Sequence, residues 1–123
     1  MAEHPNVALM RRANEEMQRD GPAGMAKYLA DDVVWHEIGR DEPRRGIAEL
    51  AASAGAVDYE ISWEVHDILG NDDHVVALGT ATATRAGRTL SYRTAEIYHV
   101  KNGKITERWA FSDDTAAITA FFA

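Results

Sequence analysis

A tryptophan, a histidine and a glutamate stand in a row at the end of a short apolar run, as Trp35, His36 and Glu37. Histidine and carboxylate side chains are common general acids and bases near neutral pH. A carboxylate inside an apolar cavity is costly to ionise, and that cost raises its pKa toward the range in which a base works best. Two interpretations are open: His36 and Glu37 cap a strand at the surface, or one of them points into a pocket.

Two arginines on later predicted strands supply the complementary chemistry. Arg93 or Arg108 can bind an anionic group or stabilise negative charge that develops on a substrate oxygen. Glu37, Arg93 and Arg108 are therefore the candidate catalytic residues. The competing interpretation is a structural ion pair between Glu37 and one of these arginines.

Other polar residues point to no second chemistry. His36, His66, His74 and His99 lack a paired ligand spacing such as HxxxH, so we predict no metal site. The chain has no cysteine, which excludes disulfides and thiol catalysis and fits a reducing cytoplasm.

Composition excludes further classes of function. The net charge of −7 argues against nucleic acid as a partner, and the pairs Arg11-Arg12 and Arg44-Arg45 are expected to be solvated surface. No apolar run approaches the ~20 residues that span a bilayer, and "MAEHPN" lacks a signal pattern, so no membrane contact is predicted. We expect one domain over residues 1–123.

The first half of the chain reads as helices around one strand. Asn6 is expected to cap a first helix, which ends at 20–22, and a second helix ends at 31–32. Residues 33–37 form a strand, and Gly46 introduces a third helix. The predicted buried stripes of the second and third helices are Met25, Tyr28 and Leu29, and Ile47, Leu50, Ala51 and Ala54.

From residue 57 onward the apolar period changes to two, which is typical of strands with one wet face. Turn sequences at 70–73, 85–88 and 101–104 separate four strands. Ser112 or Asp113 is expected to cap a short C-terminal helix. The order predicts an α+β fold with helices packed on a curved antiparallel sheet.

A hairpin register follows from the turns. A two-residue loop at 102–103 pairs Ile97 with Arg108, and one at 86–87 pairs Thr80 with Arg93. One face then carries Val76, Leu78, Thr80, Thr82, Arg93, Ala95, Ile97, Arg108, Ala110 and Ser112. The other carries Val75, Ala77, Gly79, Ala81, Tyr92, Glu96, Tyr98, Trp109 and Phe111. Periodicity does not say which face lines a cavity.

Two motifs carry a resemblance that spans nearly the whole chain. "YLADDVVWHEIG…RRGIAEL" and "AEIYHVKNGKITERWAFSDDTAAITAFF" resemble the SnoaL-like branch of the NTF2-like superfamily, which also holds ketosteroid isomerases and limonene-epoxide hydrolases. The resemblance implies a cone-shaped α+β barrel with a deep apolar pocket, a homodimer, and no metal or organic cofactor.

The resemblance also implies site residues. The proton-shuttling aspartate of the isomerases falls on Glu37, pocket residues of the epoxide hydrolases fall on Trp35 and Glu37, and Tyr28 matches an isomerase tyrosine. The Trp35 and Glu37 side chains would point inward and the His36 side chain away, because side chains of neighbouring residues on a strand alternate between its two faces. The face with Arg93 and Arg108 would line the pocket. The implied substrate-binding residues are Trp35, Tyr28, Trp63, Leu78, Thr80, Ala95, Ile97, Ala110 and Ser112.

Two hypotheses for function follow. The first is a cofactor-independent acid–base enzyme of the isomerase, cyclase, dehydratase or hydrolase type. It would act on a small, largely apolar carbonyl or hydroxy compound. The second is a non-catalytic module that binds an apolar ligand or dimerises, which alanines at positions 13, 95 and 110 favour, because relatives keep functional residues there. The predicted dimer face carries Ala77, Gly79, Ala81, Tyr92 and Trp109.

Overall fold

A single six-stranded sheet organises the structure, a computed structural model that describes residues 3–54 and 58–123. Its strand order is β2–β1–β6–β5–β4–β3; β1 runs parallel to β6, and the other neighbours are antiparallel. The elements are α1 (Pro5–Asp20), α2 (Pro22–Ala26), β1 (Leu29–Trp35), β2 (Arg44–Arg45), α3 (Ile47–Ala54), β3 (Glu60–Gly70), β4 (His74–Arg85), β5 (Arg88–Lys101), β6 (Lys104–Ser112) and α4 (Thr115–Phe122). The predicted α+β class is confirmed, as a curved sheet that does not close, but the sheet is mixed and not purely antiparallel, because β1 runs parallel to β6.

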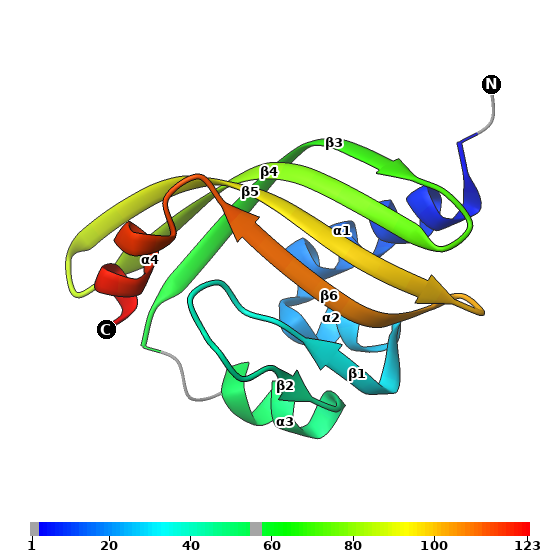
Figure 1. The fold of residues 1–123 in the computed structure, drawn as a ribbon, viewed down its shortest axis with the longest axis horizontal. Helices are drawn as coiled ribbons and strands as arrows, with labels where there is room; N and C mark the ends of the chain where they lie inside the picture. The colour runs from blue at the N-terminus through cyan, green and yellow to red at the C-terminus, as the bar shows by residue number, and fades with distance from the viewer. Residues whose placement is uncertain (1–2, 55–57) are drawn as a thin grey trace.

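The helices are distributed around the curved sheet. Figure 1 shows α1 and α2 beneath the sheet, α3 beside β1 and β2, and α4 at the end where the β4–β5 hairpin turns. The start of α1 is tied to the opposite end, because the Asn6 side-chain amide donates to the carbonyls of Asn71 and Asp72 at 3.0 Å each. None of the described helices is long and apolar enough to cross a membrane.

Two tight hairpins confirm the predicted turns. Ala86 and Gly87 have φ values of 51° and 77°, and Asn102 and Gly103 have 53° and 75°. Positive φ at both central residues gives a turn whose twist matches that of the flanking strands. The β4–β5 register is the predicted one, with Thr80 opposite Arg93.

The predicted β5–β6 register is wrong beyond the first pairs. Lys101 lies opposite Lys104, but a register shift after Val100 pairs His99 with Glu107 and Ile97 with Trp109. Thr106 is the extra residue of this β-bulge, and one extra residue turns every later side chain of β6 to the opposite face. Arg108 therefore shares a face with Tyr98, not with Arg93.

The first half of the chain departs from prediction at its element boundaries. The α1 helix is capped by His4, whose Nδ1 accepts from the Asn6 N–H at 3.1 Å, so Asn6 is not the cap. The second helix stops at Ala26, and Leu29 already lies in β1. Leu29 instead pairs with Ile105 of the parallel strand β6.

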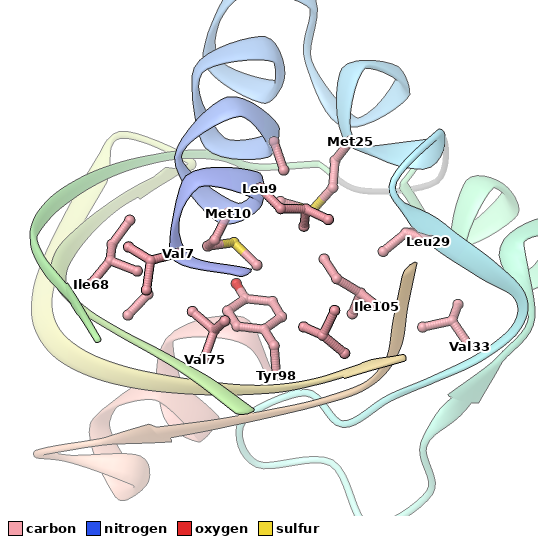
Figure 2. Close-up of a cluster of buried hydrophobic side chains, with 13 residues drawn as sticks. Val7, Leu9, Met10, Met25, Leu29, Val33, Ile68, Val75, Tyr98 and Ile105 are labelled. Carbon is pink, nitrogen blue, oxygen red and sulfur yellow. The ribbon is translucent and has the colours of Figure 1, made fainter. Parts of the chain in front are cut away.

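The core fills the space between α1 and the inner face of the sheet, which carries Val75, Ala77, Tyr98 and Ile105 among others. Figure 2 shows Met10 of α1 above the Tyr98 ring, with Leu29 and Val33 of β1 closing one side. Each of these apolar side chains contributes about 1.5–3 kcal/mol when it is fully buried. The inner face is therefore occupied within one chain.

This packing corrects the predicted dimer face. Ala77, Ala81 and Tyr92 are buried in the single chain at 0%, 3% and 8% exposure, under the helices. Gly79 is buried as well, whereas Trp109 lies opposite Ile97 on the other face. The predicted set thus mixes the two faces, because the bulge moves β6 by one residue.

A second apolar cluster fixes α4. Ile118 and Phe121 pack with Ala81, Ala83 and Tyr92. The helix is capped by Asp114, whose Oδ1 accepts from the Ala117 N–H at 3.0 Å, so neither of the predicted caps, Ser112 and Asp113, is the cap.

Candidate functional site

A large cavity opens under α2 and α3, beside the last residues of β1. Its volume is about 980 Å³, enough for a drug-sized ligand. The lining residues are Met17, Pro22, Ala23, Met25, Ala26, Leu29, Trp35, Glu37, Ile47, Leu50, Ala51, Ser53, Ala54, Tyr59, Glu60, Ile61, Ser62, Thr82 and Thr84. Most are apolar. The apolar stripe of α3 forms part of this wall; Ile47 and Leu50 also pack against the edge of the core, but no residue of α3 is fully buried.

Glu37 brings a carboxylate to the cavity wall. It follows β1, two positions after Trp35, so both side chains face the cavity. Its Oε1 accepts a 2.6 Å hydrogen bond from Nε of Arg44, and the two side chains are 35% and 22% exposed. One carboxylate oxygen thus has a protein partner, while part of the carboxylate stays open to a ligand.

Arg44 owes its position to the smallest strand in the sheet. It lies opposite Trp35 in the β1–β2 pair, and Arg45 lies opposite Val34. Gly46 then turns the chain into α3 with a φ of 85°, and its N–H donates to the Val33 carbonyl at 2.7 Å. The prediction of solvated surface is wrong for Arg44 and fits the exposed Arg45.

Trp35 is braced from behind by a buried ion pair. The Arg108 guanidinium lies 4.6 Å from the Trp35 ring centre, donates to the His36 carbonyl at 3.0 Å, and donates to Glu96 Oε1 at 2.9 Å through Nε and again through Nη2. The Arg108 and Glu96 side chains are 14% and 9% exposed. Burial lowers the pKa of Arg108, but the charge of Glu96, the neighbouring Tyr98 and the hydrogen bond to Glu96 together outweigh burial and raise the pKa above its ordinary value. Arg108 is thus committed to protein partners.

Tyr59 is a second polar group on the cavity wall, and the sequence analysis did not select it. It lies just before β3, and its ring packs edge-on against Phe122 of α4 at 4.7 Å. Burial, followed by the negative charge of Glu37, raises the pKa of Tyr59, while Arg44 opposes the rise. The phenol therefore stays protonated at neutral pH and can donate a hydrogen bond.

His36 lies on the outer face of the sheet, away from the cavity. Its ring stacks on Trp109 at 5.1 Å with 4° between the planes, and its Nε2 lies 2.7 Å from Glu107 Oε2. His99 packs edge-on against Trp109 and His74. A His36–Glu37 dyad is therefore not formed.

The outer face also holds several residues that were predicted to bind substrate. Leu78, Thr80, Arg93, Ala95 and Ile97 are absent from the described cavity lining. The prediction failed because β6 was placed one residue out of register, which grouped Arg93 with Arg108. Arg93 is instead 81% exposed and 3.8 Å from Asp113.

A shallower hollow of about 350 Å³ collects some of these residues. Leu78, Arg93 and Ala95 line it together with Phe111 and Ser112. Ala110, which lies opposite Glu96 in the β5–β6 ladder, lines neither space among the described residues. Predicted site residues are thus split between two locations.

Trp63 and Tyr28 pack elsewhere. The Trp63 indole donates to Thr94 Oγ1 at 3.0 Å and lies over Gly79, where an added Cβ would come within 2.5 Å of its Nε1. Tyr28 faces Glu16, and the hydrogen bond to that carboxylate raises the pKa of Tyr28. Neither is among the described lining residues of the cavity.

Comparison with known proteins identifies the family. The family model of the SnoaL-like domain matches residues 10–108. Among curated proteins, uncharacterised proteins of Mycobacterium tuberculosis and Mycobacterium bovis are 30% identical over 131 residues, with complete coverage of both chains. These relatives carry no named activity, and the family assignment rests on the match to the family model.

Solved structures share the fold. An NTF2-like protein of unknown function from Burkholderia pseudomallei superimposes with a TM-score of 0.84 at 23% identity, covering 96% of this chain and 97% of that one. An NTF2-like protein from Burkholderia xenovorans gives 0.79 at 25% identity, with 99% and 98% coverage. A protein described as a SnoaL-like polyketide cyclase from Mesorhizobium loti gives 0.72 at 23% identity, with 86% and 97% coverage. The predicted NTF2-like fold is confirmed.

Proposed function

The chain belongs to the SnoaL-like family, and on that basis we propose that it is a cofactor-independent acid–base enzyme. Its substrate would be a small, largely apolar carbonyl or hydroxy compound bound in the cavity under α2 and α3. The observation that carries this proposal is the Glu37 carboxylate, partly open, on the wall of an otherwise largely apolar space of about 980 Å³.

Glu37 is the proposed base. Removal of a proton next to a carbonyl group is a step that isomerisation, cyclisation and dehydration can share, and it needs a positioned carboxylate in a site that excludes water. The apolar residues Met17, Met25 and Leu50 would hold the ligand body against Trp35. The 2.6 Å bond from Arg44 would hold the carboxylate in place, so that its free oxygen faces the ligand.

A direct test uses 2-tetralone, an apolar bicyclic ketone with acidic protons next to its carbonyl group. The rate at which these protons exchange for deuterium in D₂O is followed by NMR. We expect the protein to accelerate exchange, and Glu37→Gln to reduce the acceleration by about 10²–10⁴-fold, the usual contribution of a general base. Glu107→Gln, a change to an outer-face carboxylate, is the matched control.

The second candidate function is binding without catalysis. It would be favoured if 2-tetralone bound in the cavity, by NMR shift changes at Trp35, with no acceleration of exchange. Mass spectrometry of protein purified without denaturation would then identify the ligand that the cavity retains.

We also propose that the chain forms a homodimer through the outer face of the sheet. Phe111 is 55% exposed there, next to Trp109 and the apolar hollow around Leu78 and Ala95. Large exposed aromatic side chains are enriched at protein interfaces. Light scattering at micromolar concentration is expected to give twice the mass of one chain, and Phe111→Asp to give one; a wild-type monomer would contradict the proposal.

The proposed setting is the cytoplasm, on the grounds of a chain without cysteine. The proposed partners are a small-molecule ligand and a second copy of the chain, and the net charge of −7 disfavours nucleic acid.

A further inference from the structure

Tyr59 combines features that the proposed base does not use. It lines the cavity, and its ring is held from the side by Phe122 at 4.7 Å. Among the described residues, its hydroxyl takes part in no side-chain hydrogen bond, although the Glu37 charge lies close enough to influence it. A phenol whose ring is fixed and whose hydroxyl bonds to no described side chain is available to a ligand.

The surroundings of Tyr59 fix its position. Its neighbour Asp58 lies 3.1 Å from Arg85 Nε, and Nη1 of Arg85 donates to the carbonyls of Phe121 and Ala123 at 3.1 and 2.9 Å. Arg85 thus ties the segment before β3 to the end of α4. Prior positioning of a donor reduces the entropy lost when it binds a ligand.

The charges of the cavity limit the kind of ligand group involved. The described lining residues include the carboxylates Glu37 and Glu60 and no lysine or arginine. A carboxylate or phosphate on the ligand would meet like charge without a free cation, which is unfavourable. A neutral hydroxyl group can instead accept a hydrogen bond from a phenol and donate one to a carboxylate, and a neutral carbonyl oxygen can accept the bond from the phenol.

We propose that Tyr59 donates a hydrogen bond to a neutral hydroxyl or carbonyl oxygen of the ligand, on the side of the cavity that Glu37 also faces. This inference deepens the proposed function and rests on it, because it concerns the same cavity. It assigns Tyr59 as a ligand-binding residue and the ligand as an uncharged oxygen compound. For a carbonyl ligand, the same bond would strengthen as negative charge develops on the oxygen during proton removal.

The test compares two probes that differ by one hydroxyl group, 2-naphthol and naphthalene. Their dissociation constants are measured by probe fluorescence for the wild-type protein and for Tyr59→Phe. We expect Tyr59→Phe to weaken 2-naphthol binding on the order of fivefold, the value of one net hydrogen bond, and to leave naphthalene binding unchanged. Tyr28→Phe is the matched control, since Tyr28 faces Glu16, and should change neither constant.

Each other outcome overturns the proposal. Equal weakening of both probes would mean that Tyr59 only packs, and unchanged 2-naphthol affinity, or no 2-naphthol binding to the wild-type protein, would mean that no such bond forms. The experiment measures binding alone. Tyr59→Phe could selectively weaken 2-naphthol binding even if the wild-type protein does not accelerate deuterium exchange into 2-tetralone. That result would support the hydrogen bond from Tyr59 and contradict the proposed catalysis.

Discussion

The two arginine–glutamate pairs next to Trp35 differ in how completely the protein surrounds them. Arg108 and Glu96 are 14% and 9% exposed, and Arg108 also contacts the His36 carbonyl and the Trp35 ring. The side chains of Arg44 and Glu37 are 22% and 35% exposed, and they share one 2.6 Å bond at the cavity wall. All three guanidinium nitrogens of Arg108 donate to protein oxygens, whereas the Arg44–Glu37 pair leaves room for a ligand.

This difference in exposure indicates that the Arg108–Glu96 pair stabilises the fold and that the Arg44–Glu37 pair is available for ligand binding. A buried charge without its partner is very costly, so the Arg108–Glu96 pair can only be kept or replaced as a unit. A half-exposed pair contributes little to stability, and its carboxylate can exchange partners at low cost. The contrast predicts which substitutions should unfold the chain and which should alter only the ligand site.

The largest effect is expected from breaking the enclosed pair. Glu96→Leu leaves the Arg108 guanidinium buried without a counter-charge, and should lower the free energy of unfolding by about 3–5 kcal/mol. Urea denaturation measures this loss. Glu37→Gln, which breaks the cavity pair, should cost less than about 1 kcal/mol in the same assay; similar losses from the two variants would remove the distinction between the pairs.

Replacing both members of the Arg108–Glu96 pair tests whether the loss of stability comes from an unpaired buried charge. The double variant Arg108→Leu with Glu96→Leu should recover most of the stability lost in Glu96→Leu, because no buried charge remains unpaired. The comparison is again made by urea denaturation. If the double variant were less stable than Glu96→Leu alone, Arg108 would have to stabilise the fold mainly through Trp35 and His36, and not through the ion pair.

The cavity pair is expected to act on ligands through charge. Glu37 and Glu60 line the space and Arg44 is already paired, so 2-naphthalenemethanol should bind at least about tenfold more tightly than 2-naphthoate, which corresponds to ~1.4 kcal/mol. Fluorescence titration of both probes at neutral pH gives the ratio. Tighter binding of the acid would indicate that Arg44 leaves Glu37 for the ligand.

The smallest expected effect concerns a third ion pair, between Lys27 and Glu16. Nζ of Lys27 lies 2.7 Å from Glu16 Oε1, and its hydrogen bond lowers the pKa of Glu16 below the ordinary 4.5. A lowered pKa means that the contribution to stability is present above pH 4.5 and is lost as the pH falls through the folded-state value. NMR titration should show this lowered pKa, and Lys27→Gln should move it back toward 4.5; an unchanged value in the variant would assign the shift to Tyr28 instead.

Local sequence signals predicted the hairpins and the side-chain directions at the end of the first strand. Ala86-Gly87 and Asn102-Gly103 specify turns with positive φ at both positions, and these set the β4–β5 register correctly. Alternation along β1 sends Trp35 and Glu37 to the cavity and His36 to the outer face. Each of these features depends on interactions between residues close in sequence.

The sequence-based predictions fail where the structure depends on contacts between segments that are distant in sequence. Nothing near Thr106 announces the bulge, because a bulge depends on pairing with β5, and its one-residue shift moved Arg108 away from Arg93. A two-residue strand is too short for any periodic signal, so Arg44 was predicted to be solvated. The sequence pattern around Tyr59 indicates only an alternating strand residue. Its role in the site follows from its packing against Phe122 and from its place beside Glu37 in the cavity lining.

We propose that the partly exposed carboxylate of Glu37 acts in catalysis, whereas the enclosed carboxylate of Glu96 stabilises the fold. The most direct test is the rate of deuterium exchange into 2-tetralone with Glu37→Gln, on a sample whose unfolding free energy matches the wild-type protein. We expect the acceleration of exchange to disappear in Glu37→Gln while the free energy of unfolding stays unchanged. Undiminished acceleration in this folded variant would contradict it.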